Sequence, residues 1–164
     1  MKKVSIFGGG YPKITQEYLD TVEIAKRFTK AGYIIKTGGY SGIMEAANKG
    51  CYENNGHSIG VVCATFKSTK GNEYLTDKIV ANDLFDRLRI LLDSDVFIVQ
   101  KGGIGTLAEV FILLDIIRKL DNPPVVYLIG DHWYKIIDSI EDLISEKESK
   151  LINIITNIND IRYE

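Results

Sequence analysis

The chain has 164 residues, of which 45% are hydrophobic and 26% charged, and its formal net charge is -2 at pH 7. This size and composition indicate one globular domain over residues 1–164 and exclude a disordered chain. The near-neutral charge disfavours a polymeric nucleic acid as partner. The chain contains two cysteines, which match neither a disulfide framework nor a zinc site, so we expect a reducing, cytoplasmic compartment.

No segment predicts insertion into a membrane or export. The longest apolar run, residues 110–117, contains Asp115 and is far shorter than the roughly 18 residues needed to span a bilayer. The apolar stretch that follows Lys2 and Lys3 ends at Gly8, which is too early for a secretion signal. We therefore expect no contact with a membrane.

Short apolar runs alternate with segments of helical periodicity along the chain. Strands are predicted at residues 4–7, 33–36, 58–62, 96–99, 125–129 and 151–156, and less clearly at 74–81. Helices are predicted at residues 16–31, 43–54, 82–93, 107–120 and 133–145. This alternation predicts an α/β, Rossmann-like three-layer fold around a mostly parallel sheet. The polar segment 63–73 is expected to form a loop near the ligand.

Glycine-rich turns follow three of the predicted strands, at residues 8–10, 38–42 and 102–106. Such a turn lets the backbone approach a phosphate, and the following helix presents free N–H groups and a positive dipole end. Because ligands bind beyond the carboxyl ends of parallel strands, the turns at 38–42 and 102–106 are expected to share one edge and to bind one ligand together. For each turn, and most of all for residues 8–10, simple turn geometry is the alternative.

Known nucleotide fingerprints are absent. There is no G-x-G-x-x-G after the first strand, no acidic residue at the end of the second strand, and no G-x-x-x-x-G-K-[ST] loop. We therefore expect neither a dinucleotide nor any other cofactor. His57 and His132 fit no ligand spacing, and no metal site is predicted.

Two segments resemble the Lonely Guy (LOG) family, whose members have been labelled as lysine decarboxylases. These are GGYSGIMEAANKG at residues 38–50 and GGIGTLAE at residues 102–109. The resemblance covers residues 3–156. It implies a nucleoside 5'-monophosphate phosphoribohydrolase that cleaves AMP or a modified adenine nucleotide to a free base and ribose 5-phosphate. Some relatives are molybdenum cofactor carriers, so a non-enzymatic protein that binds a phosphorylated cofactor is the alternative.

The two motifs, with the turn after the first strand, supply the candidate ligand-binding residues. These are Gly9, Gly38, Gly39, Gly42, Met44, Gly102, Gly103, Gly105 and Thr106. The chain departs from the family at Lys101, where a proline is usual, and this adds a positive charge near the expected phosphate. The family arginine before the second motif matches Arg87 with its register shifted by one, and Arg89 is the substitute.

Glu109 is the candidate catalytic carboxylate, with Arg87 beside it. Cleavage of an N-glycosidic bond develops positive charge on the ribose, which an anionic carboxylate stabilises. Since Glu109 falls in the first predicted turn of its helix, the dipole is expected to favour the ionised form. The alternative is structural, because Thr106 to Glu109 fits a T-x-x-E capping box.

The helix that contains Arg87 is expected to bury Leu84, Leu88 and Leu91, with Arg87 and Arg89 at its margins. The later helix at 107–120 is apolar on nearly every side, over residues 110–117 above all. One small domain cannot readily cover such a helix, so a symmetric homodimer through this segment is expected.

Overall fold

A computed structural model describes residues 1–163. Its strands are β1 (Lys3–Phe7), β2 (Ile34–Thr37), β3 (Ser58–Cys63), β4 (Asp77–Ala81), β5 (Val96–Val99), β6 (Val125–Ile129) and β7 (Asn153–Ile155). Its α-helices are α1 (Gln16–Lys30), α2 (Ile43–Tyr52), α3 (Leu84–Leu91), α4 (Ile104–Ile117), α5 (His132–Asp138) and α6 (Glu146–Ser149). The predicted order of elements is confirmed, and most bounds agree within three residues.

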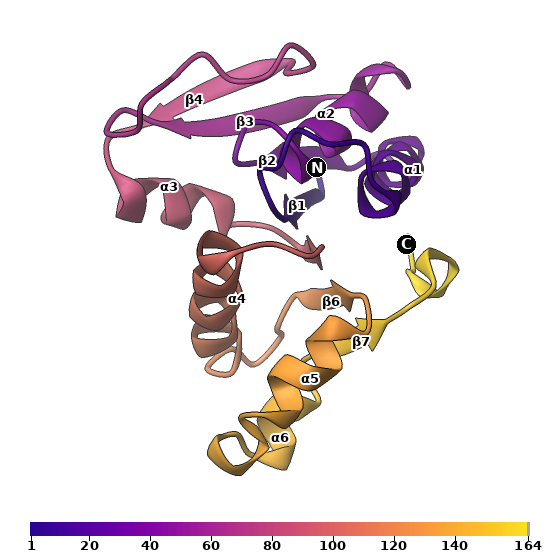
Figure 1. Cartoon of the computed structure of the whole chain (residues 1–164), viewed down its shortest axis with the longest axis vertical. Helices are drawn as coiled ribbons and strands as arrows, with labels where there is room; N and C mark the ends of the chain where they lie inside the picture. Colours follow the sequence, from indigo (N-terminus) through magenta and orange to yellow (C-terminus); the bar gives the residue numbers. More distant parts are fainter. Residues whose placement is uncertain (164) are drawn as a thin grey trace.

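The strands form one seven-stranded sheet in the order β4-β3-β2-β1-β5-β6-β7 (Figure 1). Every neighbouring pair in it is parallel. The chain builds outward from β1 to β4, and then returns to place β5 on the other side of β1. The direction of winding therefore changes between β1 and β5, which in open parallel sheets is where a crevice forms for a ligand.

Helices cover both faces of the sheet, as the predicted three-layer fold requires. Alternate side chains of β1 point to opposite faces, so that Val4 and Ile6 pack in one cluster and Phe7 in the other. The first cluster also contains side chains of α1 and α2, and the second contains those of α3, α4 and α5. The sheet is thus buried on both sides, which explains its near-continuous hydrophobic strands.

Helices α1 and α2 pack closely because α2 has a glycine at their contact. A Cβ atom added at Gly50 would overlap the backbone oxygen of Val22 in α1. In α4, by contrast, a Cβ atom at Gly105 would meet no atom within 4 Å. The two glycines therefore have different roles, although both lie inside helices.

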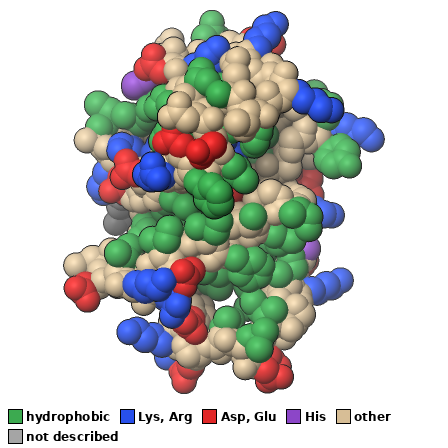
Figure 2. Space-filling view, turned by 90° about the vertical axis from the view of Figure 1, so that its left-hand side faces the viewer, with side chains coloured by type: hydrophobic (Ala, Val, Ile, Leu, Met, Phe, Trp, Pro, Cys, Tyr) green, Lys and Arg blue, Asp and Glu red, His purple; other side chains and the backbone are tan. Residues whose placement is uncertain are grey.

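The apolar helix α4 divides between core and surface. Val110, Leu113 and Ile117 are at most 1% exposed, whereas Phe111 and Ile116 are each 41% exposed. The buried side chains pack on the sheet, and the sheet leaves the other side of this apolar helix uncovered. Figure 2 shows hydrophobic side chains gathered across the middle of the face that includes α3 and α4.

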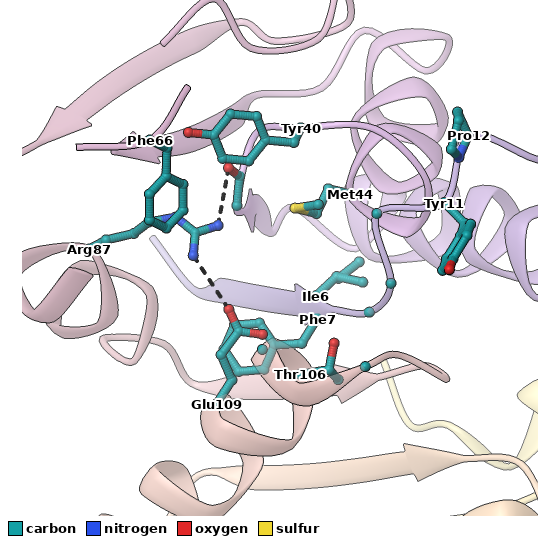
Figure 3. A pocket seen from close by; sticks show the side chains of 16 residues that line it. Ile6, Phe7, Tyr11, Pro12, Tyr40, Met44, Phe66, Arg87, Thr106 and Glu109 are labelled. Carbon is teal, nitrogen blue, oxygen red and sulfur yellow. Dashed lines mark hydrogen bonds and ion pairs between the residues drawn. The ribbon is translucent and has the colours of Figure 1, made fainter. Parts of the chain in front are cut away.

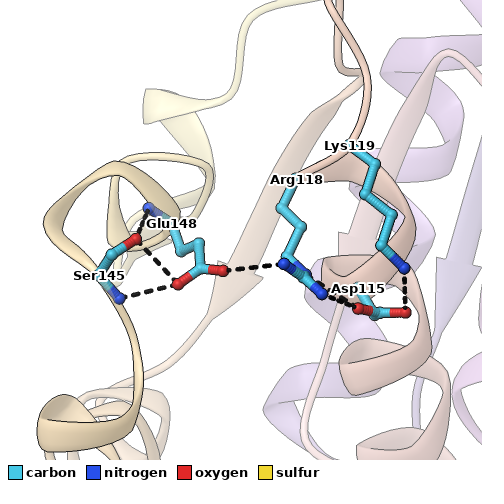
Figure 4. A network of polar contacts seen from close by, with 5 residues as sticks. All are labelled: Asp115, Arg118, Lys119, Ser145 and Glu148. Carbon is cyan, nitrogen blue, oxygen red and sulfur yellow. Dashed lines mark hydrogen bonds and ion pairs between the residues drawn. The ribbon is translucent and has the colours of Figure 1, made fainter.

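The single helix predicted at residues 133–145 is wrong, because the chain divides there into α5, a 3₁₀ turn at Glu141–Leu143 and α6. Ile140 leaves helical geometry, with φ -122° and ψ 12°, and Ser145 starts a new helix. Ser145 and Glu148 form a complete capping box, and Glu148 also lies 3.6 Å from Arg118, just beyond the end of α4 (Figure 4). This cap stabilises a separate short helix.

No helix within residues 1–163 is long and apolar enough to cross a bilayer. The segment 74–81, which the sequence left uncertain, contains β4 at the edge of the sheet. Four of its five residues, Asp77 to Val80, are exposed. Such an edge position explains why its hydrophobic pattern is weak.

We expect Gly50→Ala to lower the free energy of unfolding by about 1–3 kcal/mol, because the added methyl group must push α1 and α2 apart. Gly105→Ala is the matched control. It adds the same methyl group to a helix with open space around it, and a small gain of up to about 1 kcal/mol is expected from helix propensity. Urea denaturation of both variants measures the difference, and equal stabilities would contradict this account of the α1–α2 contact.

Candidate functional site

A cavity of about 540 Å³ opens at the carboxyl ends of the central strands (Figure 3). Its walls come from the end of β1, the turns after β1 and β2, the loop after β3, and helices α2, α3 and α4. The cavity thus lies at the point where the sheet changes its direction of winding. Its volume is in the range of pockets that bind small ligands.

The three glycine turns meet at this cavity and hold one another. The backbone N–H of Gly9 donates to the carbonyl of Lys101 at 3.0 Å, and the N–H of Ile43 donates to the carbonyl of Gly9 at 3.0 Å. A Cβ atom at Gly42, whose φ is +69°, would overlap the carbonyl oxygen of Gly9. The turns after β1, β2 and β5 are therefore packed backbone against backbone.

The candidate glycines divide into two groups. Gly9, Gly38, Gly103 and Gly105 line the cavity, as do Met44 and Thr106. The other three do not. Gly39 faces Gly60 and Val62 of β3, Gly42 packs on the turn after β1, and Gly102 lines a neighbouring cavity.

Helix α4 begins earlier than predicted, at Ile104, with Gly103 as its N-cap. No side chain caps this end, so the capping box suggested for Thr106 and Glu109 is wrong. Thr106 is the third residue of the helix and is buried. A Cβ atom added at Gly102 would overlap its side chain. Uncapped N–H groups at a helix start are able to bind an anion.

Glu109 lies one turn further along α4, with its side chain only 13% exposed. Its Oε1 is 3.7 Å from Nη1 of Arg87. Burial raises the pKa of Glu109 to about 7, while the charge of Arg87 lowers it by less. The expectation that the helix dipole favours the ionised form is therefore wrong, because Glu109 is beyond the first turn and desolvation dominates.

Arg87 occupies the inner face of α3, where it is 7% exposed. Its Nε donates to the carbonyl of Val61 at 2.8 Å, and Nη2 donates to the carbonyl of Gly38 at 3.3 Å. Leu84, predicted in the buried stripe, is instead 45% exposed, since the hydrogen-bonded arginine takes the inner position. Arg89 lies on the surface and pairs with Asp86 at 3.5 Å. Of the two arginines, Arg87 is the one in the cavity.

The far end of α3 is fixed to the sheet by two buried side chains. Nζ of Lys36 in β2 donates to the carbonyls of Ile90 and Asp93 at 2.7 and 2.6 Å. Oγ of Ser5 in β1 donates to the carbonyl of Leu91 at 2.6 Å. These bonds satisfy carbonyls that a helix end leaves unpaired. The helix that carries Arg87 is therefore fixed to the sheet both at Arg87 and at its C-terminal end.

Sequence reasoning missed the aromatic wall of the cavity. Tyr40 and Phe66 lie with ring centroids 6.0 Å apart, and the guanidinium of Arg87 is 5.8 and 5.6 Å from the two centroids. Tyr40 belongs to the second glycine turn, and Phe66 to the loop that was expected near the ligand. The presence of the hydrophobic Phe66 in an otherwise polar loop was the sequence signal that could have indicated this wall.

The cavity also includes four residues around the first strand that were not predicted, namely Ile6, Phe7, Tyr11 and Pro12. Gly8 and Gly10, from the glycine turn for which an approach to the ligand was one of two alternatives, line it as well. Lys101 does not line this cavity but the neighbouring one. Within residues 1–163 no group of three or more His, Cys, Asp or Glu side chains is placed to hold a metal ion. The chemical groups of the site are therefore a helix start, one carboxylate, one guanidinium and four aromatic rings, two of which lie beside the guanidinium.

Known proteins share this fold. The chain is 28% identical over 155 residues to the Probable cytokinin riboside 5'-monophosphate phosphoribohydrolase LOGL6 of Oryza sativa subsp. japonica, covering 90% of this chain and 61% of that protein. It is 29% identical over 142 residues to the Cytokinin riboside 5'-monophosphate phosphoribohydrolase LOG5 of Arabidopsis thaliana, covering 81% and 60%. The chain thus spans about three fifths of the length of these plant relatives.

The molybdenum cofactor binding protein from Rippkaea orientalis has a similar structure, with a TM-score of 0.78 and 22% identity over 96% of this chain and 91% of that one. At this identity the similarity supports the Rossmann-like fold alone. The model of the SLOG cluster4 family matches residues 1–158, nearly the whole chain. Together with the LOG relatives, this match confirms the resemblance that the two glycine motifs indicated, and the chain belongs to the SLOG cluster4 family.

Proposed function

We propose that the protein hydrolyses the N-glycosidic bond of a nucleoside 5'-monophosphate, AMP or a modified adenine nucleotide, to a free base and ribose 5-phosphate. The observation that carries this proposal is the buried pair of Glu109 and Arg87, 3.7 Å apart, in the same cavity as the uncapped start of α4. The plant relatives named as phosphoribohydrolases support it.

The start of α4 is suited to hold the 5'-phosphate. Its N-cap, Gly103, makes no side-chain capping bond, and a Cβ atom at Gly103 or Gly105 would meet nothing within 4 Å. A phosphate can therefore approach the backbone N–H groups and the hydroxyl of Thr106. The helix dipole adds to this attraction.

Glu109 is suited to the chemical step. As the bond to the base breaks, the ribose becomes cationic, and the carboxylate of Glu109 stabilises that charge or takes a proton from the attacking water. Its pKa of about 7 is close to the value that general base catalysis needs near neutral pH. Arg87 keeps part of the carboxylate ionised and orients it. The rings of Tyr40 and Phe66 offer a flat apolar surface for the base.

The second candidate function is that of a carrier for a phosphorylated cofactor such as the molybdenum cofactor. The similarity of fold to the Rippkaea orientalis protein favours it. A carrier would use the same phosphate-binding helix start, but it would need no carboxylate with a raised pKa. Incubation with AMP and related monophosphates, followed by chromatography for free base, separates the two functions.

We expect Glu109→Gln to reduce the release of adenine from AMP by about a hundredfold or more, because the charge that stabilises the ribosyl cation is lost. The amide has nearly the same shape, so AMP affinity in calorimetry should be retained. Adenosine, which lacks the phosphate, should be a poor ligand for both proteins.

Glu148→Gln is the matched control, since Glu148 forms the capping box of α6 at the surface, where an amide is also accepted. It should leave turnover unchanged and lower the melting temperature only slightly, since it also removes the exposed ion pair with Arg118. Undiminished turnover in Glu109→Gln, with normal AMP binding, would contradict the proposed role of Glu109.

We expect the pH profile of kcat/KM to fall on its acid side near pH 7, because the ionised form of Glu109 is the active one and burial raises its pKa to about 7. Arg87→Met should move this limb to higher pH, since Arg87 lowers that pKa. A limb at the ordinary glutamate value, about 4.3, would contradict this role.

The pH dependence of protein stability gives an independent measure of the pKa of Glu109. The folded-state pKa of Glu109 is raised, so its contribution to stability is greatest below the unfolded pKa and is lost as pH rises through about 7. The melting temperature of Glu109→Gln, relative to the wild type, should therefore increase between pH 5 and pH 8. A difference that is constant with pH would show that Glu109 ionises normally.

We also propose a homodimer through the exposed side of α4. Phe111, Ile112 and Ile116 remain at least 37% exposed on this helix, and Leu84 and Phe85 of α3 are exposed as well. Both helices belong to the face on which Figure 2 shows hydrophobic side chains gathered. A symmetric partner would bury them without disturbing the sheet.

Light scattering at micromolar concentration is expected to give the mass of two chains. Phe111→Glu should convert the protein to a monomer with a folded circular dichroism spectrum, because the charge would be buried unpaired in the interface. Leu19→Glu is the matched control, because Leu19 is 52% exposed on α1, which packs on the opposite face of the sheet from α4, and it should leave the mass unchanged. A monomeric wild type would overturn the dimer.

A further inference from the structure

A second cavity, of about 390 Å³, lies beside the candidate site. The two cavities share Gly9, Tyr11 and Gly103 in their linings. The turn after β1 and the start of α4 therefore contact both spaces. A ligand with one phosphate at the start of α4 is thus adjacent to the second cavity as well as to Glu109.

The second cavity has an excess of positive charge. Lys13 and Lys101 line it, and Glu17 is the one acidic residue in its lining. A backbone hydrogen bond and the hydroxyl of Thr15 hold the pKa of Glu17 below its usual value, with a further contribution from the charge of Lys101. Neither lysine forms an ion pair with another residue in the range 1–163, whereas Lys3, Lys119 and Lys150 do. Two cations therefore line this space, and Glu17, which interacts with the charge of Lys101, is the single carboxylate among the residues that line it.

Polar groups without protein partners lie close to Lys101. Nε2 of Gln100, the preceding residue, is buried and has no hydrogen-bond partner. Nε2 of His132 is also buried and without a hydrogen-bond partner. Burial lowers the pKa of His132, and the charges of Lys101 and Glu17 contribute in opposite directions. Buried polar groups are normally hydrogen-bonded, so these two nitrogens are exceptions. Neither side chain lines the second cavity, so the groups available to an anion in it are the two lysines and the start of α4 that it shares with the candidate site.

We propose that the second cavity is a subsite for a second phosphate, so that nucleoside 5'-diphosphates bind to the site more tightly than the monophosphate whose hydrolysis is proposed above. The phosphate next to the ribose binds at the start of α4, and the outer phosphate binds between Lys13 and Lys101. This inference rests on the proposed function for the position of the first phosphate. Lys101 stands where the resembling family usually has proline, which cannot supply the charge or its hydrogen-bond donors.

Calorimetry at fixed ionic strength tests the subsite with AMP and ADP as probes, without added metal. The wild type is expected to bind ADP about tenfold more tightly than AMP, as one additional charge-assisted contact would give. The double variant Lys13→Met, Lys101→Met keeps both apolar stems and removes both charges. It should bind ADP and AMP equally, with its AMP affinity within about twofold of the wild type.

Lys147→Met is the matched control, since Lys147 is an exposed lysine on α6 that lines neither cavity, and it should change neither affinity. Equal binding of ADP and AMP by the wild type, or a preference for ADP that survives in the double variant, would overturn the subsite. Failure of both nucleotides to bind would count against the proposed function. Pyrophosphate and phosphate then serve as probes, and a preference for pyrophosphate that needs both lysines supports the subsite, while its absence rejects it.

Discussion

The buried guanidinium of Arg87 connects the parts of the site that come from distant points in the sequence. It donates hydrogen bonds to carbonyls after β2 and in β3, contacts the faces of two aromatic rings, and lies 3.7 Å from Glu109 on α4. A buried cation is tolerated only with such partners, because an unpaired one would cost several kcal/mol. The same bonds place α3 on the sheet. The hydrogen bonds that hold α3 on the sheet therefore also fix the position of Arg87 beside Glu109.

Much of the fold followed from the sequence, for a clear physical reason. Strands that are buried on both faces consist of short hydrophobic runs. This sequence contains five such runs, separated by segments of helical periodicity and by glycine turns. That pattern is typical of parallel βα units, and it predicted both the parallel sheet and the edge of the sheet at which the cavity lies. It also predicted that residues 38–42 and 102–106 lie at one cavity, since the carboxyl ends of parallel strands share an edge.

The wrong predictions concern interactions between residues far apart in the sequence, which a local sequence pattern does not contain. T-x-x-E at Thr106 and S-x-x-E at Ser145 look alike, yet only the second forms a capping box. The first lies inside α4 because Gly103 already starts the helix, in a turn held by the strands on either side. Likewise, periodicity favoured Leu84 over Arg87 for the core of α3, but carbonyls of β2 and β3 decided otherwise. The pKa of Glu109 depends on burial among residues that no motif includes.

The glycine motifs combine two physical requirements that the sequence cannot separate. Gly42 and Gly102 are needed for packing, since a side chain there would overlap the turn after β1 or Thr106. Gly103 and Gly105 have open space at the position of a Cβ atom, so packing within the chain does not require glycine there. Their lack of a side chain instead leaves the first N–H groups of α4 accessible from the cavity. The glycines that packing leaves unexplained are thus the ones that a phosphate would need.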